Sequence, residues 1–256
     1  MKVSIITVCF NSENTIVDTI SSVQQQSYHD IEYIIVDGGS TDKTLQLIDK
    51  SDYRPHHFIS EPDRGIYDAM NKGLALASGD IIGILNSDDF YIDSDVVFDV
   101  VEVFKSNTNI DLLLGNVDFI STQNVDKVIR EYSSFKFSPW KMRFGFMPAH
   151  PGAFIKKSAY EQVGNYKLGY KIAADFDIFV RLLLVNDLCY TKINKTIIRM
   201  RLGGISTSGF RSYLVTSNEV LRSLKENNIY SNIVMVLMRL PIKLLQSFLS
   251  RVGTKK

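Results

Sequence analysis

The sequence predicts an α/β fold built on a mostly parallel, doubly wound sheet. Short apolar runs rich in β-branched residues alternate with amphipathic helical segments from residue 1 to about residue 105, the pattern of parallel strands joined by helical crossovers. Polar clusters that contain aspartate follow the second and the fourth of these runs. With 256 residues, 45% hydrophobic and 22% charged, the chain can bury a large core, which excludes disordered and disulfide-stapled classes.

The first half carries four predicted strands and four predicted helices. The strands are Val3–Cys9, Ile31–Val36, His57–Ser60 and Ile81–Leu85. The first helix has apolar Ile16, Ile20 and Val23 at helical spacing, and the second follows Gly39. The third spans Tyr67–Ala77, and the fourth runs from Ser94 or Asp95 to about Lys105. We expect Asn11 or Ser12 to cap the first helix and Ser40 or Thr41 the second, because short polar side chains accept hydrogen bonds from the N–H groups of a first turn.

The alternation of strands and helices ends near residue 111, and the second half combines extended segments, an irregular stretch and helices. The expected elements are extended segments Leu112–Ser121 and Lys127–Ser134, an irregular stretch Lys141–Ala153, helices Ser158–Gly164 and Asp175–Val185, a strand Cys189–Arg201, and helices Tyr213–Lys225 and Ile229–Leu249. We expect one domain over residues 1–210, with halves 1–110 and 111–210, followed by a helical segment over residues 211–256.

Charge is divided unevenly along the chain. Residues 1–131 carry 22 acidic and 9 basic residues, a net of −13, whereas residues 132–256 carry 6 acidic and 20 basic residues, a net of +14. Two explanations stay open, namely an uneven surface, or a first half that holds a cation and a second half that meets phosphates or lipid headgroups. Nucleic acid is not expected as a partner, because the basic residues form no dense run and accompany no nucleic-acid-binding motif.

The two cysteines and the first ten residues indicate whether the protein is expected in a reducing or an oxidising compartment. Cys9 and Cys189 are far apart and form no C-x-x-C pair, which fits a reducing environment and argues against zinc. The segment MKVSIITVCF lacks a basic region followed by a long apolar stretch, so no signal peptide is expected.

Three aspartates sit where parallel strands are expected to end. Asp37 follows the second strand, and Asp88 and Asp89 follow the fourth. In open α/β sheets ligands bind at the carboxyl ends of the strands, and paired carboxylates favour a hard cation such as Mg²⁺ or Mn²⁺. Two simpler roles stay open: Asp88 and Asp89 capping the helix ahead, and Asp37 forming a turn.

Other nucleotide and hydrolase sites are excluded by their missing motifs. The chain has no G-x-G-x-x-G after the first strand and no G-x-x-x-x-G-K-[ST] segment, so a dehydrogenase or a P-loop enzyme is not expected. It also lacks a G-x-S-x-G elbow and an H-E-x-x-H helix.

Five segments in order carry a family resemblance. They are VSIITVCFN, VDGGSTDKT, SEPDRGIYDAMNKGLALASGD, ILNSDD and AADFDIFVRLL. Over residues 1–210 the chain resembles the inverting glycosyltransferases of family 2, which have the GT-A fold, and especially bacterial enzymes that build surface polysaccharides such as O-antigen lipopolysaccharide, capsule or exopolysaccharide. The resemblance implies that residues 1–110 bind a nucleotide sugar and that residues 111–210 carry the acceptor side and the catalytic base.

The resemblance also implies a donor site. Thr7, Val8 and Phe10 would meet the nucleotide base, and Asp37 would accept a hydrogen bond from a uracil ring. Asp89, with Asp88, would bind Mn²⁺ or Mg²⁺ together with the ribose and diphosphate of a UDP-sugar. The family's D-x-D motif begins here with Asn86, and its frequent arginine is replaced by Met70, so Arg64 or Lys72 would supply the cation near the phosphates.

The catalytic base would be Asp175, the second residue of a family acidic pair that reads Ala174-Asp175 here. It would take the proton of an acceptor hydroxyl that attacks the anomeric carbon, a role worth about 10²–10⁴ in rate. Because no amino-acid nucleophile is needed, configuration inverts in one step. Asp177 and Arg181 share a helix face and are expected to pair as structural residues.

Three further residues have open roles. His150, between two prolines, would line the acceptor pocket or touch the diphosphate, with a structural role as the alternative. Arg201 and Ser206, around the Gly203-Gly204 turn, would close over the phosphates as a lid.

The C-terminal segment predicts contact with a membrane surface. Residues 229–256 contain five Lys or Arg and no acid, and their apolar core is too interrupted to span a bilayer. A basic amphipathic helix at the interface fits this pattern, with packing on the catalytic domain as the alternative. The expected location is the cytoplasm, peripheral on the cytoplasmic face of the inner membrane, and the resemblance suggests a lipid-linked saccharide acceptor.

The expected function is therefore metal-dependent, inverting transfer of a hexosyl or N-acetylhexosaminyl group to a saccharide hydroxyl. Two alternatives stay open. A sugar-1-phosphate nucleotidyltransferase should have a glycine-rich basic first loop, whereas this loop reads CFNSENT. A catalytically silent nucleotide-sugar-binding protein would fit the replaced positions Asn86 and Ala174.

Overall fold

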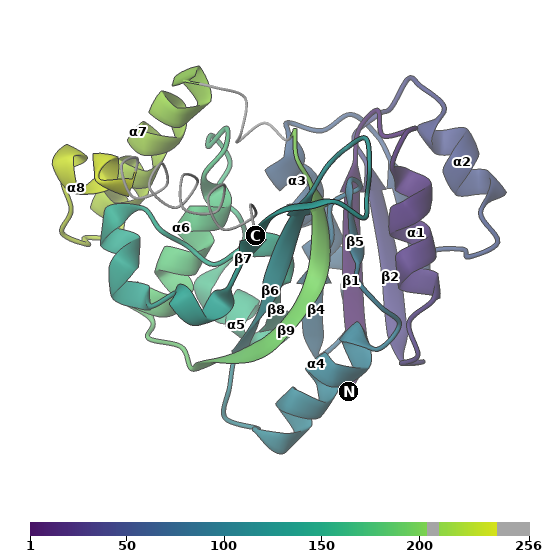
Figure 1. The fold of residues 1–256 in the computed structure, drawn as a ribbon, viewed down its shortest axis with the longest axis horizontal. Helices are drawn as coiled ribbons and strands as arrows, with labels where there is room; N and C mark the ends of the chain where they lie inside the picture. Colours follow the sequence, from purple (N-terminus) through teal and green to yellow (C-terminus); the bar gives the residue numbers. More distant parts are fainter. Residues whose placement is uncertain (204–209, 240–256) are drawn as a thin grey trace, which may run out of the picture.

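A computed structural model describes residues 1–203 and 210–239. Its centre is a curled nine-stranded sheet in the order β3-β2-β1-β4-β8-β6-β9-β5, with β7 paired to β6 (Figure 1). The strands are β1 Val3–Cys9, β2 Ile31–Asp37, β3 His57–Ser60, β4 Ile81–Ile84, β5 Asp89–Tyr91, β6 Leu112–Ile120, β7 Val128–Tyr132, β8 Ala153–Lys156 and β9 Tyr190–Arg201. This is the GT-A arrangement, so the expected fold class is confirmed.

The first half of the sheet is parallel. β1 pairs with β2 and β4, and β2 pairs with β3, all in the same direction. Every residue of β1 and β2 is buried, because helices cover both faces and the strands therefore need no polar side. All four strands predicted for this half are present, and their carboxyl ends lie along one edge of the sheet.

The second half is mixed, and it contributes to the same sheet. β8 lies between β4 and β6 and is antiparallel to both, whereas the long β9 runs parallel to β6 and antiparallel to β5. Neither β5 nor β8 was expected. Each has only three or four residues, and each pairs with strands that are distant in sequence, so local periodicity carries no sign of them.

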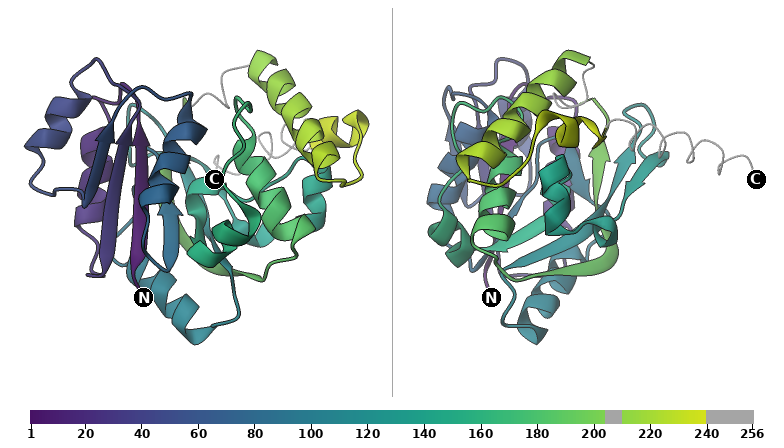
Figure 2. Two further views of the ribbon diagram at one scale, coloured as in Figure 1. Left: turned by 180° about the vertical axis from the view of Figure 1, so that it is seen from behind. Right: turned by 90° about the vertical axis from the view of Figure 1, so that its left-hand side faces the viewer.

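Helices cover both faces of the sheet (Figure 2). They are α1 Ile16–Gln24, α2 Thr44–Lys50, α3 Ile66–Leu76, α4 Val96–Ser106, α5 Lys157–Val163, α6 Ala174–Val180, α7 Phe210–Glu226 and α8 Ile233–Leu237, with short 3₁₀ turns η1 Ser134–Lys136, η2 Pro139–Phe144 and η3 His150–Gly152 and a π-helical turn η4 Arg181–Val185. α1, α2 and α4 share one core, and α3, α5, α6 and α7 share the other. At Gly73 α3 approaches β1 so closely that a Cβ atom would lie 2.4 Å from Ile6 Cγ2.

Two predicted helix caps are wrong. α1 begins after Thr15 rather than after Asn11 or Ser12, and α2 begins after Lys43 rather than after Ser40 or Thr41. The physical reason is that these polar side chains have other partners. Ser40 Oγ donates to Asp37, and the backbone N–H of Thr41 donates to Asn11 Oδ1 at 2.9 Å.

The described part of the C-terminal segment packs on the core that α3 and α6 share. Val220 and Leu224 of α7 and Val236 of α8 are buried in the same core as α3 and α6. The helix expected at Ile229–Leu249 begins at Ile233, and residues 240–256 lie outside the described residues. In residues 1–203 and 210–239, no helix is both long enough and apolar enough to cross a bilayer.

Candidate active site

The carboxyl edge of the parallel strands gathers the polar clusters that the sequence singled out. Asp37 is the last residue of β2, and Asn86–Asp89 leave β4 on the neighbouring side of β1. The loop after β1 joins the two clusters, since Ser12 Oγ lies 2.7 Å from Ser87 Oγ and Asn11 N donates to Ser40 Oγ at 2.8 Å. The site is therefore built from three adjacent strand ends.

Asp37 is fully buried and uses both carboxylate oxygens inside the protein. Oδ2 accepts from the backbone N–H groups of Gly39 and Ser40, each at 3.0 Å, and from Ser60 Oγ at 2.8 Å. Oδ1 accepts from Ser40 Oγ and from the buried Cys9 thiol. The side chain thus holds the loop after β2 in place, and the expected contact with a uracil ring, which stays a prediction, requires exchange of one of these bonds.

A second carboxylate lies over the same loop. Asp63, in the loop after β3, places Oδ2 only 2.3 Å from where a Cβ atom on Gly38 would be, so the absence of a side chain at Gly38 lets this carboxylate lie against the loop. Its other oxygen, Oδ1, accepts from the backbone N–H of Gly65 at 2.8 Å. Sequence reasoning did not single out Asp63. The acidic Glu61–Asp63 stretch after β3 was the available signal.

The three residues expected to meet the base differ in exposure. Thr7 and Val8 have buried side chains, and Thr7 Oγ1 accepts a hydrogen bond from Tyr33 at 3.2 Å. Thr7 has no exposed surface, and the carbonyl of Val8 accepts from Ser87 N at 3.3 Å. Phe10, just beyond β1, is 61% exposed and offers an aromatic face at the edge. Contact of these residues with a base stays a prediction.

The acidic pair after β4 has an incomplete set of partners. Asp89 is fully buried, and Asn86 Nδ2 donates to its Oδ2 at 3.2 Å. Among the described residues neither Asp89 Oδ1 nor Asn86 Oδ1 has a hydrogen-bond partner. Burial, and next the neighbouring Asp88, raise the pKa of Asp89 well above its usual range, and burial also raises the pKa of Asp88.

This donor set fits a hard cation that shares its ligands with a substrate. In residues 1–203 and 210–239 no group of three or more His, Cys, Asp or Glu converges, so the protein alone does not complete a shell. Two carboxylates and a free amide oxygen are nevertheless present, and Mg²⁺ or Mn²⁺ normally keeps waters and phosphate oxygens as its other ligands. The unpartnered oxygens of Asp89 and Asn86 are the observation in favour of such an ion.

Arg201, the last residue of β9, is brought to this acidic pair from the other half of the chain. Its Nη1 donates to the carbonyl of Asp88 at 3.0 Å, its Nη2 pairs with Asp18 of α1, and its guanidinium lies 5.0 Å from the centre of the Phe90 ring. The expected lid includes Ser206, which lies outside the described residues. Contact of Arg201 with phosphates stays a prediction.

The two other candidate cations are engaged by acids. Arg64 pairs with Asp68 at 2.8 Å, one turn later in α3. Lys72 pairs with Glu61 at 2.8 Å and donates to the carbonyl of Pro62 at 3.3 Å. Their expected role near a diphosphate stays a prediction.

Asp175 lies at the start of α6, next to α3. Tyr67, in the first turn of α3, donates to the carbonyl of Ile172 and lies 3.4 Å from Asp175 Oδ1, which also accepts from its neighbour Phe176 N at 2.8 Å. Because α3 follows β3, its first turn is at the carboxyl edge, and Asp175 therefore belongs to the edge that carries the acidic pair. Burial raises the pKa of Asp175 to about 6, which outweighs the opposing hydrogen bonds.

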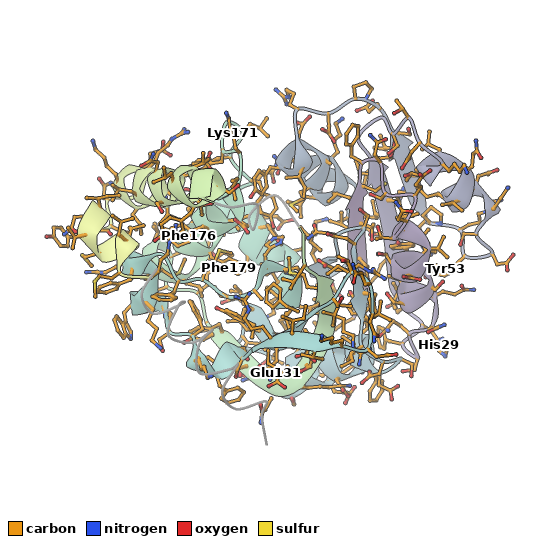
Figure 3. All side chains as sticks on the ribbon, turned by 45° about the horizontal axis from the view of Figure 1, so that its top comes forward. His29, Tyr53, Glu131, Lys171, Phe176 and Phe179 are labelled. Carbon is orange, nitrogen blue, oxygen red and sulfur yellow. The ribbon has the colours of Figure 1, made fainter. Side chains whose placement is uncertain are left out.

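A carboxylate from α7 holds the segment before Asp175. Glu219 accepts from the backbone N–H groups of Lys171, Ile172 and Ala173, at 2.7, 2.9 and 2.9 Å. Figure 3 shows Lys171 at the tip of this loop and Phe176 on α6 beneath α7. Sequence reasoning missed Glu219. The available signal was that the basic half of the chain has only six acids.

A buried ion pair fastens α6 to its surroundings. Arg181 Nε donates to Asp177 Oδ2 at 2.8 Å, as their spacing predicted. Asp177 Oδ1 also accepts from Ser223 Oγ and Asn227 Nδ2 of the α7 region, each at 2.9 Å, and from Lys167 at 3.2 Å. The expected structural role of Asp177 and Arg181 agrees with these contacts.

His150 lies in the core rather than beside an open pocket. Its Nε2 is 2.7 Å from Tyr166 Oη, and its ring packs edge-on against Tyr166 and Phe179. Burial lowers the pKa of His150 to about 4, so the ring is neutral at pH 7. The structural alternative accounts for these contacts, and the expected contact with substrate gains no support from them.

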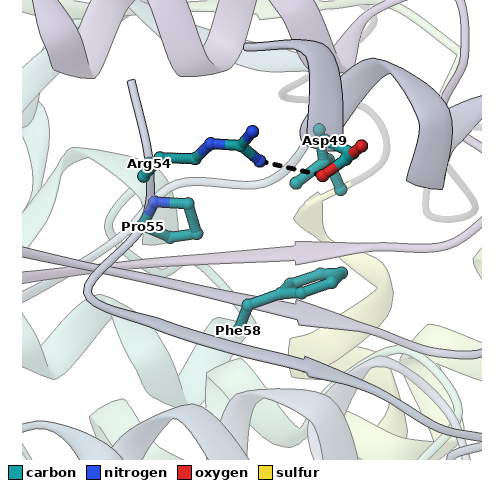
Figure 4. A pocket seen from close by; sticks show the side chains of 5 residues that line it. Asp49, Arg54, Pro55 and Phe58 are labelled. Carbon is teal, nitrogen blue, oxygen red and sulfur yellow. Dashed lines mark hydrogen bonds and ion pairs between the residues drawn. The ribbon is translucent and has the colours of Figure 1, made fainter. Parts of the chain in front are cut away.

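Two hollows in the described surface lie away from this edge. One of 190 Å³ is lined by Ile48, Asp49, Arg54, Pro55 and Phe58 at the outer side of β3, where Arg54 pairs with Asp49 at 2.9 Å (Figure 4). Both of these charged side chains are exposed, and no buried acid faces the hollow. The candidate site is instead identified by the polar side chains that come together at the carboxyl edge of the sheet.

Comparisons with known proteins agree on fold and family. The family model described as glycosyl transferase family 2 matches residues 4–164. An uncharacterized glycosyltransferase of Mycobacterium tuberculosis is 34% identical over 188 residues, which cover 72% of this chain and 69% of that protein. Staphylococcus aureus TarS 1–349, solved in complex with UDP-GlcNAc, has a TM-score of 0.68 at 19% identity, covering 88% of this chain and 66% of its own. The mannosyltransferase PcManGT of Pyrobaculum calidifontis, solved with GDP-Man and Mn²⁺, has a TM-score of 0.65 at 15% identity, covering 100% and 76%.

Proposed function

The chain belongs to glycosyltransferase family 2, and from this premise we propose that it moves a sugar from a nucleotide diphosphate sugar to a hydroxyl group of a saccharide, with inversion at the anomeric carbon. The observation that carries the proposal is Asp175. It is a carboxyl group with a pKa raised to about 6, at the edge of the sheet where Asp88 and Asp89 also lie.

Asp175 acts as the general base. Its ionised carboxylate takes the proton of the acceptor hydroxyl while the hydroxyl oxygen bonds to the anomeric carbon. The bond from that carbon to the diphosphate oxygen breaks, and both of its electrons leave with the nucleoside diphosphate. A pKa near 6 supports this role, because the group is ionised at pH 7 and still basic enough to accept a proton in the transition state.

Asp89, with Asp88 and Asn86 Oδ1, would hold Mn²⁺ or Mg²⁺, and the bound ion would supply positive charge to the departing diphosphate. Arg201 fixes the backbone at Asp88 and thereby orients this pair. Support for the ion comes from the unpartnered oxygens of Asp89 and Asn86 and from Mn²⁺ in the PcManGT complex.

We propose a UDP-sugar as the donor. The solved complex of TarS with UDP-GlcNAc supports this choice, as does the edge of the sheet around Phe10, Gly38 and Asp63, which offers an aromatic face and a carboxylate. The acceptor would be a saccharide of a cell-surface polysaccharide, carried on a lipid diphosphate.

We also propose that the enzyme docks on the cytoplasmic face of the inner membrane. Val234 of α8 is 67% exposed, and Trp140 of η2 is 59% exposed. The segment just before α8 is joined to η2, because Ser231 Oγ donates to the carbonyl of Arg143 at 2.6 Å. Lys141 Nζ lies 5.9 Å from the centre of the Trp140 ring, Lys192 Nζ lies 5.8 Å from the centre of the Phe135 ring, and Lys136 and Arg143 belong to the same stretch of chain. Aromatic and basic side chains together suit an anionic lipid surface.

Thermal stability with ligands tests the donor site. UDP with Mn²⁺ should raise the melting temperature of the full chain, because a ligand that binds only the folded state stabilises it. GDP and CMP with Mn²⁺ are the controls for the base. Absence of any shift with every nucleotide, together with absence of sugar transfer from UDP-sugars, would contradict the proposed function.

Flotation with vesicles tests the membrane proposal. The full chain should float with vesicles that contain anionic lipid and less with neutral ones. Val234→Glu and Trp140→Ala should reduce flotation, whereas Phe58→Ala removes an exposed aromatic on the far strand β3 and should leave it unchanged. Equal flotation of all four proteins would contradict the docking surface.

A further inference from the structure

We infer that Glu219 of α7 is the positioning residue for Asp175, because its carboxylate fixes the three backbone N–H groups that lead into the helix of the base. The inference rests on the proposed function, since it assigns a role in the same reaction. Glu219 is 44 positions from Asp175 and lies outside the residues that match the family model.

The contact is a carboxylate that bridges consecutive peptides. Oε1 accepts from Lys171 N at 2.7 Å, and Oε2 accepts from Ile172 N and Ala173 N at 2.9 Å. These N–H groups precede the first turn of α6, where no intrahelical partner exists for them. Without Glu219 the segment two to four residues before Asp175 would lose all three bonds at once.

A residue of α3 holds the same segment from the other side. Tyr67 donates to the carbonyl of Ile172, so the Ile172 residue is fixed by its N–H group to α7 and by its carbonyl to α3. Tyr67 Oη is also 3.4 Å from Asp175 Oδ1. Besides the bond that Asp175 Oδ1 accepts from Phe176 N in its own helix, the position of Asp175 therefore depends on a segment held by these two neighbouring helices.

Glu219 is itself well anchored. One turn later in α7, Ser223 Oγ donates to the buried Asp177 Oδ1 at 2.9 Å, and Asn227 Nδ2 does the same. Val220 and Leu224 are buried beside it. α7 is thus joined to the α6 region at two places along its length. Glu219 binds the loop before α6, and Ser223 binds Asp177 within α6. Together these contacts fix the position of Glu219 relative to Asp175.

The charge of Glu219 acts on the base as well. It is a negative group near Asp175 and raises the pKa of that carboxyl, but by less than burial does and by less than each of the opposing hydrogen bonds lowers it. Its removal should therefore shift the acid limb of the activity profile toward lower pH. A residue that only stabilised the fold would change the melting temperature and leave this limb in place.

The test compares Glu219→Gln and Glu219→Ala with Glu226→Gln in the full chain. Glu226 is seven positions along the same helix, pairs with Arg222 and Lys167 and accepts from Tyr170 Oη at 2.9 Å, whereas its hydrogen bonds among the described residues include none to the N–H groups of residues 171–173. Glu219→Ala should lower kcat about 10–100-fold, as expected for loss of charged hydrogen bonds, with KM for the donor within about twofold. Glu219→Gln should lower kcat less and move the acid limb to lower pH, and Glu226→Gln should leave both unchanged.

Hydrogen exchange gives a readout that does not need turnover. The amides of residues 171–173 should exchange faster in Glu219→Gln than in the wild type, and no faster in Glu226→Gln. If the wild type transfers sugar and Glu219→Ala keeps its kcat, the inference is wrong while the proposed function stands. If the wild type transfers no sugar, the proposed function fails. Unchanged exchange at these amides overturns the positioning contact in either case.

Discussion

The guanidinium of Arg201 donates to the backbone carbonyl of Asp88 at 3.0 Å, although 113 positions separate the two residues. Through this contact the last residue of β9 fixes the loop that follows β4. The mixed half of the sheet therefore determines the backbone geometry of the acidic pair that the parallel half provides.

Arg201→Ala should weaken both stability and catalysis. The change leaves the Asp88 carbonyl without this donor and Asp18 without its ion pair, which should cost about 1–3 kcal/mol in the free energy of unfolding. Chemical denaturation and kcat/KM for the donor measure the two effects. Arg54→Ala removes an exposed, paired arginine far from the site and should change neither. A fully active Arg201→Ala protein would contradict the role of this contact.

Asp89→Asn should abolish sugar transfer. The substitution is nearly isosteric but removes the charge that would hold a divalent ion at the diphosphate, and loss of charge stabilisation there should cost at least about 10²-fold in kcat. Turnover with added Mn²⁺ measures it. Asp49→Asn, at an exposed acid, is the matched control. Wild-type turnover that persists in EDTA would remove the ion from the mechanism.

The acid limb of kcat should fall with a midpoint near pH 6. Asp175 must be ionised to accept a proton, and burial raises its pKa to about 6, so kcat should drop about tenfold for each pH unit below that value. Rates at saturating donor and acceptor between pH 4.5 and 8 test this. A midpoint near 4, the ordinary value of an aspartate, would contradict a base with a raised pKa.

Asp175→Asn should be inactive and yet more stable at neutral pH. A folded pKa above the unfolded value means that the folded state favours the protonated form, so this group stabilises the protein fully below about pH 4 and loses that contribution as the pH rises through about 6. Asparagine does not ionise, so the Asp175→Asn variant does not lose this stability as the pH rises. The variant should gain up to about 2 kcal/mol over the wild type at pH 8 and nothing at pH 4. Urea unfolding at both values measures it, and a destabilised variant at pH 8 would contradict the prediction.

His150→Leu should lower stability and spare donor binding. The substitution removes the Nε2 partner of Tyr166 in the core, which leaves a buried hydroxyl less well satisfied and should cost about 1–3 kcal/mol. The KM for the donor should stay within about twofold. A large rise of that KM without loss of stability would instead favour the substrate contact that the sequence suggested.

The parallel half of the fold could be predicted from the sequence because each of its strands carries its own signal. β1 and β2 are mostly apolar runs rich in β-branched residues, and residues such as Ile16 and Ile20 recur at helical spacing. β5 and β8 could not be predicted, because three- or four-residue strands exist only through pairing with β9, β4 and β6. The helix caps failed for a related reason: Ser40 had a tertiary partner in Asp37, and tertiary partners leave no local pattern.

Site residues that lie in short sequence motifs could be predicted. Site residues that only the folding of the chain brings there could not. Asp37, Asp88, Asp89 and Asp175 were singled out from short segments, and the structure places all of them at the carboxyl edge. Glu219 and Asp63 were not singled out, because their contacts join elements that are distant in sequence or depend on a neighbouring glycine. His150 illustrates the reverse case, since its flanking prolines suggested a functional loop and its side chain lies in the core.

The two thiols of the chain differ in a way that is useful at the bench. Cys9 is buried, and burial together with the nearby Asp37 raises its pKa, so it stays a neutral thiol at ordinary pH; Cys189 is exposed. A maleimide dye should consequently attach to Cys189 alone, without any engineered substitution. Because Cys189 directly precedes β9, whose far end carries Arg201, a dye there would be tied to the strand that reaches the acidic pair, and its emission could be followed as nucleotide is added.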